Sequence, residues 1–380
     1  MNNLALCMIV RDEEVNIIDC LESVVDSIDY WVICDTGSTD NTISLIKDFF
    51  KTHNISGELH EDEWVDFGHN RTLAFERARD KSEWVYVIDA DDRLNGKISI
   101  PEKTPCNCFT LTIRHGDLEH SRQQLFKNDL EWEYVGVLHE YPNLKNHSLI
   151  KENLGGCFVQ ASASGYRSKS NDKKYENDIN TLLEGIKKEP TNVRYCFYLA
   201  QSYKDNNDNM NAIIWYKKRS EMGGWYEEVF FSLYSVGICK ERMGLDFEKE
   251  ILHDYLKAFN YRKSRLEPLY RIINFYIGKN KFKEAFGYGM LAYKTPYPSD
   301  QLFLTKDVYA WQFNDVVSRA ASWLGLWELS VDMIQTLIKE RKYPDSVHSR
   351  MLSNLKLCKN QLIIDRNKRL ENKNIQILFI

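Results

Sequence analysis

The chain has no long hydrophobic run, since none of its apolar stretches approaches the roughly 18 to 20 consecutive apolar residues of a membrane helix. Its beginning has neither a basic leader nor a small-residue cleavage site, so a secretory signal peptide is not expected. The nine cysteines are scattered, and only Cys106 and Cys108 lie close together, so neither a disulfide framework nor a zinc site is indicated. These absences predict a reduced, soluble, cytoplasmic protein without a membrane span.

What is present is typical of a globular protein with two to three domains. The 380 residues are 43% hydrophobic and 28% charged, which excludes disordered and fibrous classes. The charge is uneven: residues 1–165 carry 15 basic and 29 acidic side chains, whereas residues 166–380 carry 35 and 26. We therefore predict one domain over 1–165 and another over 166–380. The acidic first domain suits a divalent cation, and we expect no nucleic-acid partner.

Three apolar runs in the first domain have the length and composition of buried strands, and they lie at Leu4–Val10, Tyr30–Cys34 and Trp84–Ile88. Amphipathic helical patterns follow them, one of them over Asn70–Arg79. Each run ends in a polar, acidic loop. The pattern predicts a Rossmann-like open α/β sheet, in which ligands bind beyond the carboxyl ends of the strands.

Acidic residues at two of these strand ends indicate a site for a nucleotide and a metal. Asp35 can accept a hydrogen bond from a base or a ribose, and Gly37 allows the backbone to approach a ligand closely. Asp89 and Asp91 form a D-x-D motif that can serve a ribose hydroxyl and Mg²⁺ or Mn²⁺. Such a cation would stabilise the charge on a departing diphosphate.

The D-x-D motif has two other interpretations. An isolated D-x-D is more often a capped turn than a metal site, but here it ends a hydrophobic strand and is accompanied by Asp35 on an earlier strand end. Haloacid-dehalogenase phosphatases also place D-x-D after a strand. Arg93 stands where their motif requires Thr or Val, which disfavours that class.

Six short motifs follow one another in a fixed order along residues 1–165. They lie at Met8–Glu14, Cys20–Val24, Asp35–Thr42, Asp66–Arg71, Val87–Asp92 and Trp132–Tyr141. Together they resemble family 2 glycosyltransferases, and most of all a subgroup with a helical-repeat tail. The resemblance implies a single-domain GT-A fold built around a nucleotide-sugar donor. The Q-x-x-R-W motif of processive polysaccharide synthases is absent from the sequence, which argues against a membrane polymerase.

The resemblance also implies roles for individual residues. The donor nucleotide would be bound by Val10, Arg11, Asp35, Gly37, Arg71, Asp89 and Ala90. Mn²⁺ or Mg²⁺ would be ligated by Asp91, Asp89 and His139. Enzymes of this kind are inverting and need a base for the acceptor. Since no E-D pair marks it, Glu140 is the first candidate and Asp117 the alternative. His139 and Glu140 could also simply cap a turn after a strand.

Three tryptophans of the first domain, Trp64, Trp84 and Trp132, are expected in the core rather than as platforms for a sugar. Trp132 is the best candidate for an exception, because it precedes the loop that carries His139 and Glu140.

The second domain shows helical patterns rich in aromatic residues from about Tyr175 onward. Residues 193–226 fit a 34-residue tetratricopeptide frame, and a second fit begins near Leu266, with a longer, less regular unit between them. The pattern predicts an all-α, TPR-like solenoid, with a plain α-bundle as the alternative. The polar stretch Arg167–Lys174 is the expected hinge, and the helices could form an acceptor-protein cradle or a homodimer interface.

The leading hypothesis is a metal-dependent, inverting hexosyltransferase that uses a nucleotide-sugar, and a UDP-sugar is the expected donor. The acceptor stays open among protein, peptide and glycan. One alternative is a catalytically inactive scaffold that binds a protein partner through its repeats. Another is a nucleotidyltransferase, although the acidic stretch Arg11–Glu14 differs from the Gly-rich first loop of those enzymes.

Overall fold

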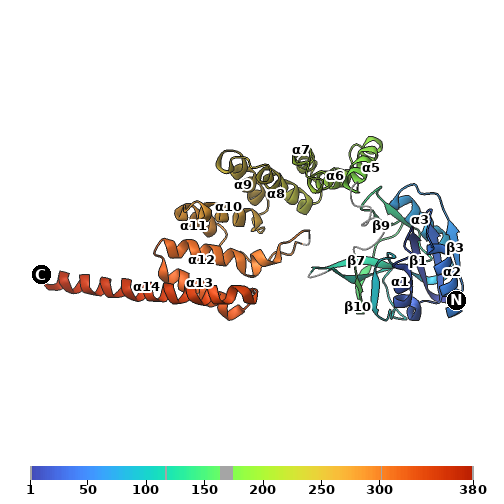
Figure 1. Cartoon of the computed structure of the whole chain (residues 1–380), viewed down its shortest axis with the longest axis horizontal. Helices are drawn as coiled ribbons and strands as arrows, with labels where there is room; N and C mark the ends of the chain where they lie inside the picture. The colour runs from blue at the N-terminus through green and yellow to red at the C-terminus, as the bar shows by residue number, and fades with distance from the viewer. Residues whose placement is uncertain (1, 116–117, 163–173, 301, 379–380) are drawn as a thin grey trace. The chain divides into compact units, whose positions relative to one another are not determined.

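The structure is a computed structural model that describes residues 2–115, 118–162, 174–300 and 302–378. Asp117 and most of the predicted hinge, residues 167–173, lie outside these ranges. The chain forms two compact units, residues 1–198 and 199–380 (Figure 1). The predicted boundary after residue 165 follows the last strand and stays a prediction.

The first unit is built on an eight-stranded mixed sheet of order β3-β2-β1-β4-β7-β6-β10-β5. Its strands are β1 (Asn2–Val10), β2 (Tyr30–Asp35), β3 (Gly57–Glu61), β4 (Ser82–Val87), β5 (Arg93–Gly96), β6 (Cys108–His115), β7 (Leu118–Lys127) and β10 (Lys151–Gln160), and a separate hairpin pairs β8 (Trp132–Val135) with β9 (Tyr141–Leu144). Strands β3, β2, β1 and β4 run parallel, whereas β7 is antiparallel to both of its neighbours. The three strands predicted from apolar runs are β1, β2 and β4, and they are confirmed.

Helices cover both faces of this sheet. They are α1 (Ile17–Val24) and α2 (Thr42–His53) on one face and α3 (Phe67–Ala78) on the other, and α5 (Lys174–Lys188) follows the last strand in the chain. Leu6 and Met8 of β1 belong to one core cluster with Ile17 of α1, while Cys7 belongs to a second cluster with Phe75 of α3. Because β1 is buried on both faces, its sequence is a continuous apolar run. The helix predicted over Asn70–Arg79 is α3, which begins three residues earlier.

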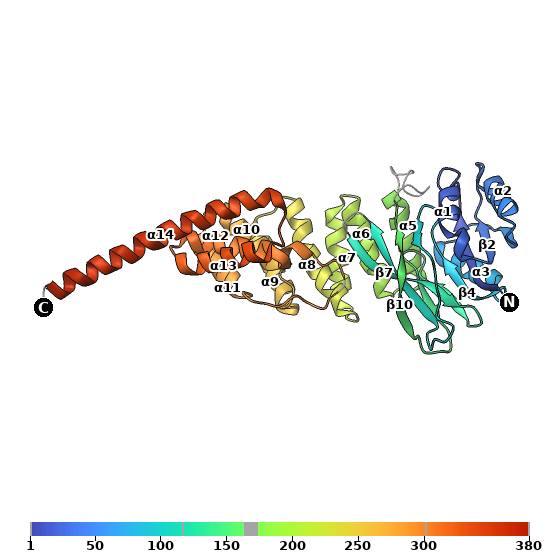
Figure 2. The same ribbon diagram turned by 90° about the horizontal axis from the view of Figure 1, so that it is seen from below.

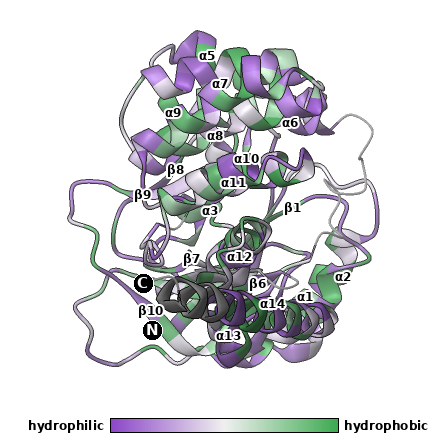
Figure 3. Ribbon diagram, turned by 90° about the vertical axis from the view of Figure 1, so that its left-hand side faces the viewer, coloured by the Kyte–Doolittle hydropathy of each residue, from purple (hydrophilic) through white to green (hydrophobic). Residues whose placement is uncertain are grey.

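The second unit is an array of helices that pack on their neighbours in chain order. It comprises the end of α6 (Val193–Asp205), then α7 (Asn209–Glu221), α8 (Tyr226–Arg242), α9 (Leu252–Tyr261), α10 (Glu267–Gly278), α11 (Phe282–Met290), α12 (Phe313–Trp323), α13 (Trp327–Glu340) and α14 (Asp345–Leu378), with π-helical turns at Phe247–Ile251 and Val308–Gln312. The C-terminal part of α14 extends past the other helices (Figure 2). Hydrophobic and hydrophilic residues alternate along these helices, as stacking requires (Figure 3).

Close packing in the second unit depends on small residues. A Cβ at Gly237 of α8 would lie 2.4 Å from the ring of Tyr255, and one at Gly289 would lie 2.6 Å from Val317. The two predicted repeats correspond to α6–α7 and α10–α11. The predicted fold class, a GT-A α/β sheet followed by a TPR-like helical array, is confirmed.

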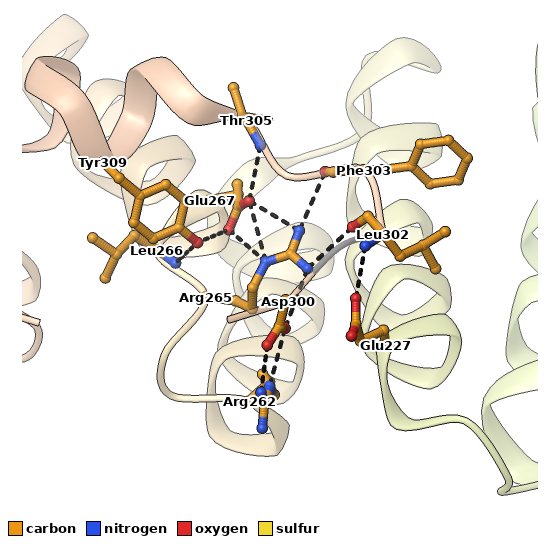
Figure 4. Close-up of polar contacts among 10 residues, drawn as sticks. All are labelled: Glu227, Arg262, Arg265, Leu266, Glu267, Asp300, Leu302, Phe303, Thr305 and Tyr309. Carbon is orange, nitrogen blue, oxygen red and sulfur yellow. Dashed lines mark hydrogen bonds and ion pairs between the residues drawn. The ribbon is translucent and has the colours of Figure 1, made fainter. Parts of the chain in front are cut away.

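A buried ionic network in the second unit is centred on Arg265 (Figure 4). Its guanidinium donates to Glu267 at 2.9 Å, to Asp300 at 3.4 Å and to the carbonyl oxygens of Leu302 and Phe303 at 3.2 Å. These bonds hold the segment before α12 against the start of α10.

Other groups complete this network. The hydroxyl of Tyr309 donates to Glu267 at 2.7 Å, and Arg262 pairs with Asp300. The backbone N–H of Leu302 donates to Glu227 at 2.6 Å. The carboxylates of Glu267 and Asp300 are therefore matched by cationic or hydroxyl donors.

Two further facts concern the whole chain. All nine cysteines are buried free thiols. Among the described residues, no helix is both long and apolar enough to cross a bilayer.

Candidate active site

A cavity of about 880 Å³ opens at the carboxyl ends of the central strands in the first unit. Its lining includes Val10 and Arg11 at the end of β1, Thr36 after β2, and the turn Asp89–Asp92 after β4. Parallel pairing explains this convergence, since β1 and β2 end in register at the pair Val10↔Asp35. The structure therefore brings together the strand ends that the sequence indicated.

Asp35 is buried at the end of β2, and its two carboxylate oxygens differ. Oδ1 accepts hydrogen bonds from the backbone N–H groups of Gly37 at 2.9 Å and Ser38 at 2.8 Å. Oδ2 is buried and has no hydrogen-bond partner among the described residues. A buried acceptor without a donor is costly, so Oδ2 is a place where a ligand N–H would be stabilised.

The turn after Asp35 requires glycine at position 37 because of its backbone conformation. Gly37 has φ of +101°, a region that side chains disfavour, whereas a Cβ at this position would touch nothing within 4 Å. The expectation that Gly37 keeps the backbone open to a ligand is consistent with this empty space.

Asp89 lies between two arginines that also line the cavity. It accepts from Arg71 at 2.6 Å and from Arg122 at 3.0 Å. Burial alone would raise the pKa of Asp89, but the two guanidinium groups outweigh it and hold that pKa below its usual range. Asp89 is therefore a permanent anion that fixes two cations at the cavity wall.

Arg71 also holds Glu140, the residue predicted as the base. The Nε of Arg71 lies 2.8 Å from Oε1 of Glu140. This contact depends on Gly68 at the start of α3, because a Cβ there would lie 2.4 Å from the carbonyl oxygen of Gly136. Only a glycine lets the loop that carries Glu140 approach α3 this closely.

The remaining residues of the turn after β4 add two carboxylates and one core residue. Asp91 and Asp92 both line the cavity, and Ala90 belongs to the adjacent core cluster. Asp92 accepts from the backbone N–H of Ser162 at 3.2 Å. Burial, reinforced by the neighbouring charge of Asp89, raises the pKa of Asp92 to about 7. The turn thus carries two carboxyl groups, Asp89 and Asp92, whose pKa values are shifted in opposite directions.

His139, the third predicted metal ligand, has other contacts. Its ring stacks on Tyr198 with centroids 3.9 Å apart, and its carbonyl oxygen accepts from Arg194 at 3.1 Å. No three His, Cys, Asp or Glu side chains within the described ranges gather as a metal-binding group. The structure does not assemble the set of Asp89, Asp91 and His139, so the metal role of His139 stays a prediction. The alternative base Asp117 lies outside the described residues.

The tryptophans are distributed differently from our expectation. Trp84 and Trp132 are buried in the core, so the suggestion that Trp132 could be the exception is wrong. Trp64 is 38% exposed and lines the cavity, so its placement in the core is also wrong. The reason is that Trp64 lies in the loop between β3 and α3 rather than in a strand.

Sequence reasoning missed two further parts of the wall. One is Arg122, which β7 carries between β4 and β6; no spacing signal links it to Asp89. The other is a polar face of α5, made by Lys174, Asn177, Asp178 and Thr181. Their i, i+3, i+4, i+7 spacing places them on one side of a helix, and this spacing was a usable signal.

Residues 5–101 match the family model described as glycosyl transferase family 2. This segment contains β1, β2, β4 and the turn Asp89–Asp92. The resemblance stated from the sequence motifs is therefore confirmed for this part of the chain.

Curated relatives match over longer stretches. The glycosyltransferase SunS of Bacillus subtilis strain 168 and that of Bacillus phage SPbeta are each 29% identical over 224 residues, covering 56% of this chain and 51% of the relative. A TPR repeat-containing protein of Synechococcus elongatus is 31% identical over 149 residues, covering 37% of this chain and 35% of that protein. The chain thus spans about half the length of the two SunS proteins. These matches support a transferase.

Solved structures give weaker similarity. TarS of S. aureus is 12% identical with a TM-score of 0.34 and covers 66% of this chain and 55% of its own. MamA is 15% identical with a TM-score of 0.35 and covers 47% of this chain and 95% of its own.

Proposed function

We propose that this protein is a metal-dependent, inverting glycosyltransferase that transfers a hexosyl group from a UDP-sugar to an acceptor. One observation carries the proposal. In a segment that matches glycosyl transferase family 2, residues at the ends of β1, β2 and β4 line one cavity, where the carboxylates of Asp89, Asp91 and Asp92 lie together with Arg71. Arg122 of β7, which follows that segment in the chain, adds a second guanidinium beside Asp89. A nucleotide-sugar needs both kinds of group, since its hydroxyls and its cation bind carboxylates and its diphosphate binds cations.

The donor would be held by its two ends. Asp35 would accept a ring N–H of the base through Oδ2, and Val10 and Arg11 would line the same subsite. Because Asp89 is already paired with Arg71 and Arg122, we assign it the task of aiming both guanidinium groups at the diphosphate. Guanidinium groups suit this task because they donate in pairs to phosphate oxygens.

The residues at the turn also fit a divalent cation. Mg²⁺ and Mn²⁺ bind one or two protein carboxylates and complete their shell with phosphate oxygens and water, so a cluster of three protein ligands is not required. Asp91 would hold the cation, and the metal roles predicted from the sequence for Asp89 and His139 stay predictions. When bound, the cation neutralises charge on the departing diphosphate.

The acceptor side is less defined by the residues. Glu140 is our proposed base and Asp117 the alternative. The polar face of α5 also lines the cavity and has no role assigned above, and we propose that it meets the acceptor. Three further properties stay predictions: the nature of the acceptor as a protein, peptide or glycan, a homodimer through the helical unit, and a cytoplasmic location.

The test is nucleotide binding by calorimetry, with UDP, CDP, GDP and dTDP, each with and without Mn²⁺. We expect UDP to bind most tightly and Mn²⁺ to strengthen its binding. Asp91→Ala should remove the effect of Mn²⁺ and abolish hydrolysis of the UDP-sugar, while Asp48→Ala, an exposed carboxylate on α2, should change neither. Absence of nucleotide binding by the wild-type chain would instead support the inactive scaffold.

A further inference from the structure

The loop between β3 and α3 carries Trp64, which lines the cavity and has no role in the function proposed above. We infer that Trp64 is the stacking wall of the nucleobase subsite and that Asn70 positions it. The inference rests on the proposed function, since it concerns how the same cavity recognises the donor nucleotide.

The position of Trp64 follows from the sheet. Strand β3 is hydrogen-bonded to β2, and their last paired residues are Asp35 and Glu61. One residue further, the backbone N–H of Asp62 donates to the carbonyl oxygen of Asp35 at 2.8 Å. The loop that carries Trp64 therefore leaves the sheet beside the turn of Asp35, at the end of the strand order away from β7, β6 and β10.

Trp64 shares one cavity with Thr36, the residue after Asp35. Trp64 is 38% exposed, so part of this large aromatic residue is open to solvent. The ring of Phe67 meets it edge-on, with centroids 4.8 Å apart at 81°. An indole that is held against a neighbouring ring and also lines a cavity is suited to stack on a planar ligand.

Asn70 fixes the backbone on both sides of Trp64. This side chain is buried; its Nδ2 donates to the carbonyl oxygen of Glu63 at 2.9 Å and its Oδ1 accepts from the N–H of Val65 at 3.0 Å. The residues before and after Trp64 are thus held by one amide group. This arrangement keeps the indole in place before a ligand arrives, which reduces the entropy lost on binding.

The two surfaces of the subsite recognise different parts of a base. The unpaired Oδ2 of Asp35 accepts a ring N–H, which uracil, thymine and guanine offer in their neutral forms and cytosine and adenine do not. The face of Trp64 accepts any base, because every base has a π-face. Stacking would therefore supply affinity, and Asp35 would supply selectivity.

The experiment measures binding of UDP, UDP-glucose and inorganic pyrophosphate by calorimetry, with Mn²⁺ present. Trp64→Ala and Trp64→Leu should weaken UDP and UDP-glucose by about tenfold or more, the range of base–aromatic stacking, and leave pyrophosphate unchanged. Trp64→Phe should restore most of the affinity. Asn70→Ala, in which the indole is present but not fixed, should give a smaller loss of affinity for UDP. Asp35→Asn should change the order of affinity among UDP, CDP, GDP and dTDP.

The matched control is Trp225→Ala, which removes a tryptophan of similar exposure, 43%, from the helical unit. It should leave all three affinities unchanged. UDP should quench the tryptophan fluorescence of the wild-type chain and of Trp225→Ala but not that of Trp64→Phe. This signal separates stacking from a purely structural role.

Two outcomes would overturn the inference while the proposed function stands. In one, Trp64→Ala and Trp64→Leu bind UDP as tightly as the wild type; in the other, they lose affinity for UDP-glucose but not for UDP, which would place the indole against the sugar. Failure of the wild-type chain to bind any nucleotide would overturn the proposed function, and the inference with it.

Discussion

Each of the two units contains a buried arginine paired with carboxylates, and the two clusters differ in what surrounds them. In the helical unit, the side chains of Arg265 and Asp300 are 0% exposed, and two backbone carbonyl oxygens take further N–H groups of Arg265. In the sheet unit, Arg71 is almost as buried, but the side chain of Asp89 beside it is 31% exposed and lines a cavity.

Both clusters consist of arginine and carboxylate groups, but the cluster around Arg265 has a structural role and the cluster around Arg71 belongs to the candidate active site. The cluster around Arg265 satisfies its donors and acceptors internally, so its effect is to hold the segment before α12 in place. The cluster around Arg71 concentrates charge at a surface that a ligand can reach. Burial of an ion pair alone therefore does not identify a binding site; the cavity beside it does.

The largest effect should come from breaking the closed cluster. Arg265→Ala leaves Glu267 and Asp300 buried with fewer partners, and we expect the free energy of unfolding to fall by about 3–5 kcal/mol. Urea unfolding followed by circular dichroism measures this loss. Arg366→Ala removes an exposed pair with Glu328 and should change stability by less than about 1 kcal/mol. Equal losses in both variants would show that Arg265 is no more than a surface charge.

The next largest effect should come from the carboxylate paired with Arg71. Glu140→Gln keeps the shape of the side chain but removes its basicity, so kcat for sugar transfer or donor hydrolysis should fall by about a hundredfold or more. Donor affinity should stay within a factor of a few. Glu133→Gln on β8 provides the matched control. A fully active Glu140→Gln enzyme would move the role of base to Asp117.

A smaller effect is expected from Arg122, because Arg71 remains to balance Asp89. Arg122→Ala removes one charged hydrogen bond. We expect kcat/KM for the donor to fall by about tenfold to a hundredfold, which corresponds to the free energy of one hydrogen bond to a charged group. The melting temperature should change little, since the side chain of Arg122 is 36% exposed. A large loss of stability with unchanged kcat/KM would place Arg122 with Arg265 as a structural residue.

The smallest effect concerns a half-buried cluster around Glu58 of β3. The hydrogen bond from Lys81, with further ones from Tyr30 and His60, lowers the pKa of Glu58 to about 2. A depressed carboxyl pKa stabilises the fold above the unfolded value near 4.3, and this contribution is lost as pH falls toward 2. Glu58→Gln should therefore lower the melting temperature slightly at pH 7 and not at pH 2. The same small difference at both pH values would contradict this assignment.

The sequence was most informative where strands are buried on both faces. β1, β2 and β4 are continuous apolar runs, and their ends fixed the positions of Asp35 and the turn Asp89–Asp92. Strands β7 and β10 carry many polar residues, since part of their surface faces solvent or the cavity, and the pairings of β7 with β4 and of β10 with β6 join segments that are far apart in the chain. Arg122 could not be placed for that reason.

Other errors have equally local causes. Trp64 is a large apolar residue of the kind usually found in a core. Its position at the cavity depends on the hydrogen bonds of Asn70 to the residues before and after it, and no periodicity in the sequence predicts such bonds. In the helical unit, the two predicted repeats fit α6–α7 and α10–α11. The irregular unit between them contains a π-helical turn at Phe247–Ile251, which adds a residue to the helical spacing and disrupts the repeat.

The nine buried thiols offer a way to follow each unit separately. Seven of them, from Cys7 to Cys196, lie in the first unit, and Cys239 and Cys358 lie in the second. Only the thiolate reacts with alkylating reagents, and burial raises the pKa of Cys239 to about 11 and that of Cys7 to about 12. Modification at each cysteine, followed by mass spectrometry during mild denaturation, would therefore report which half of the molecule opens first.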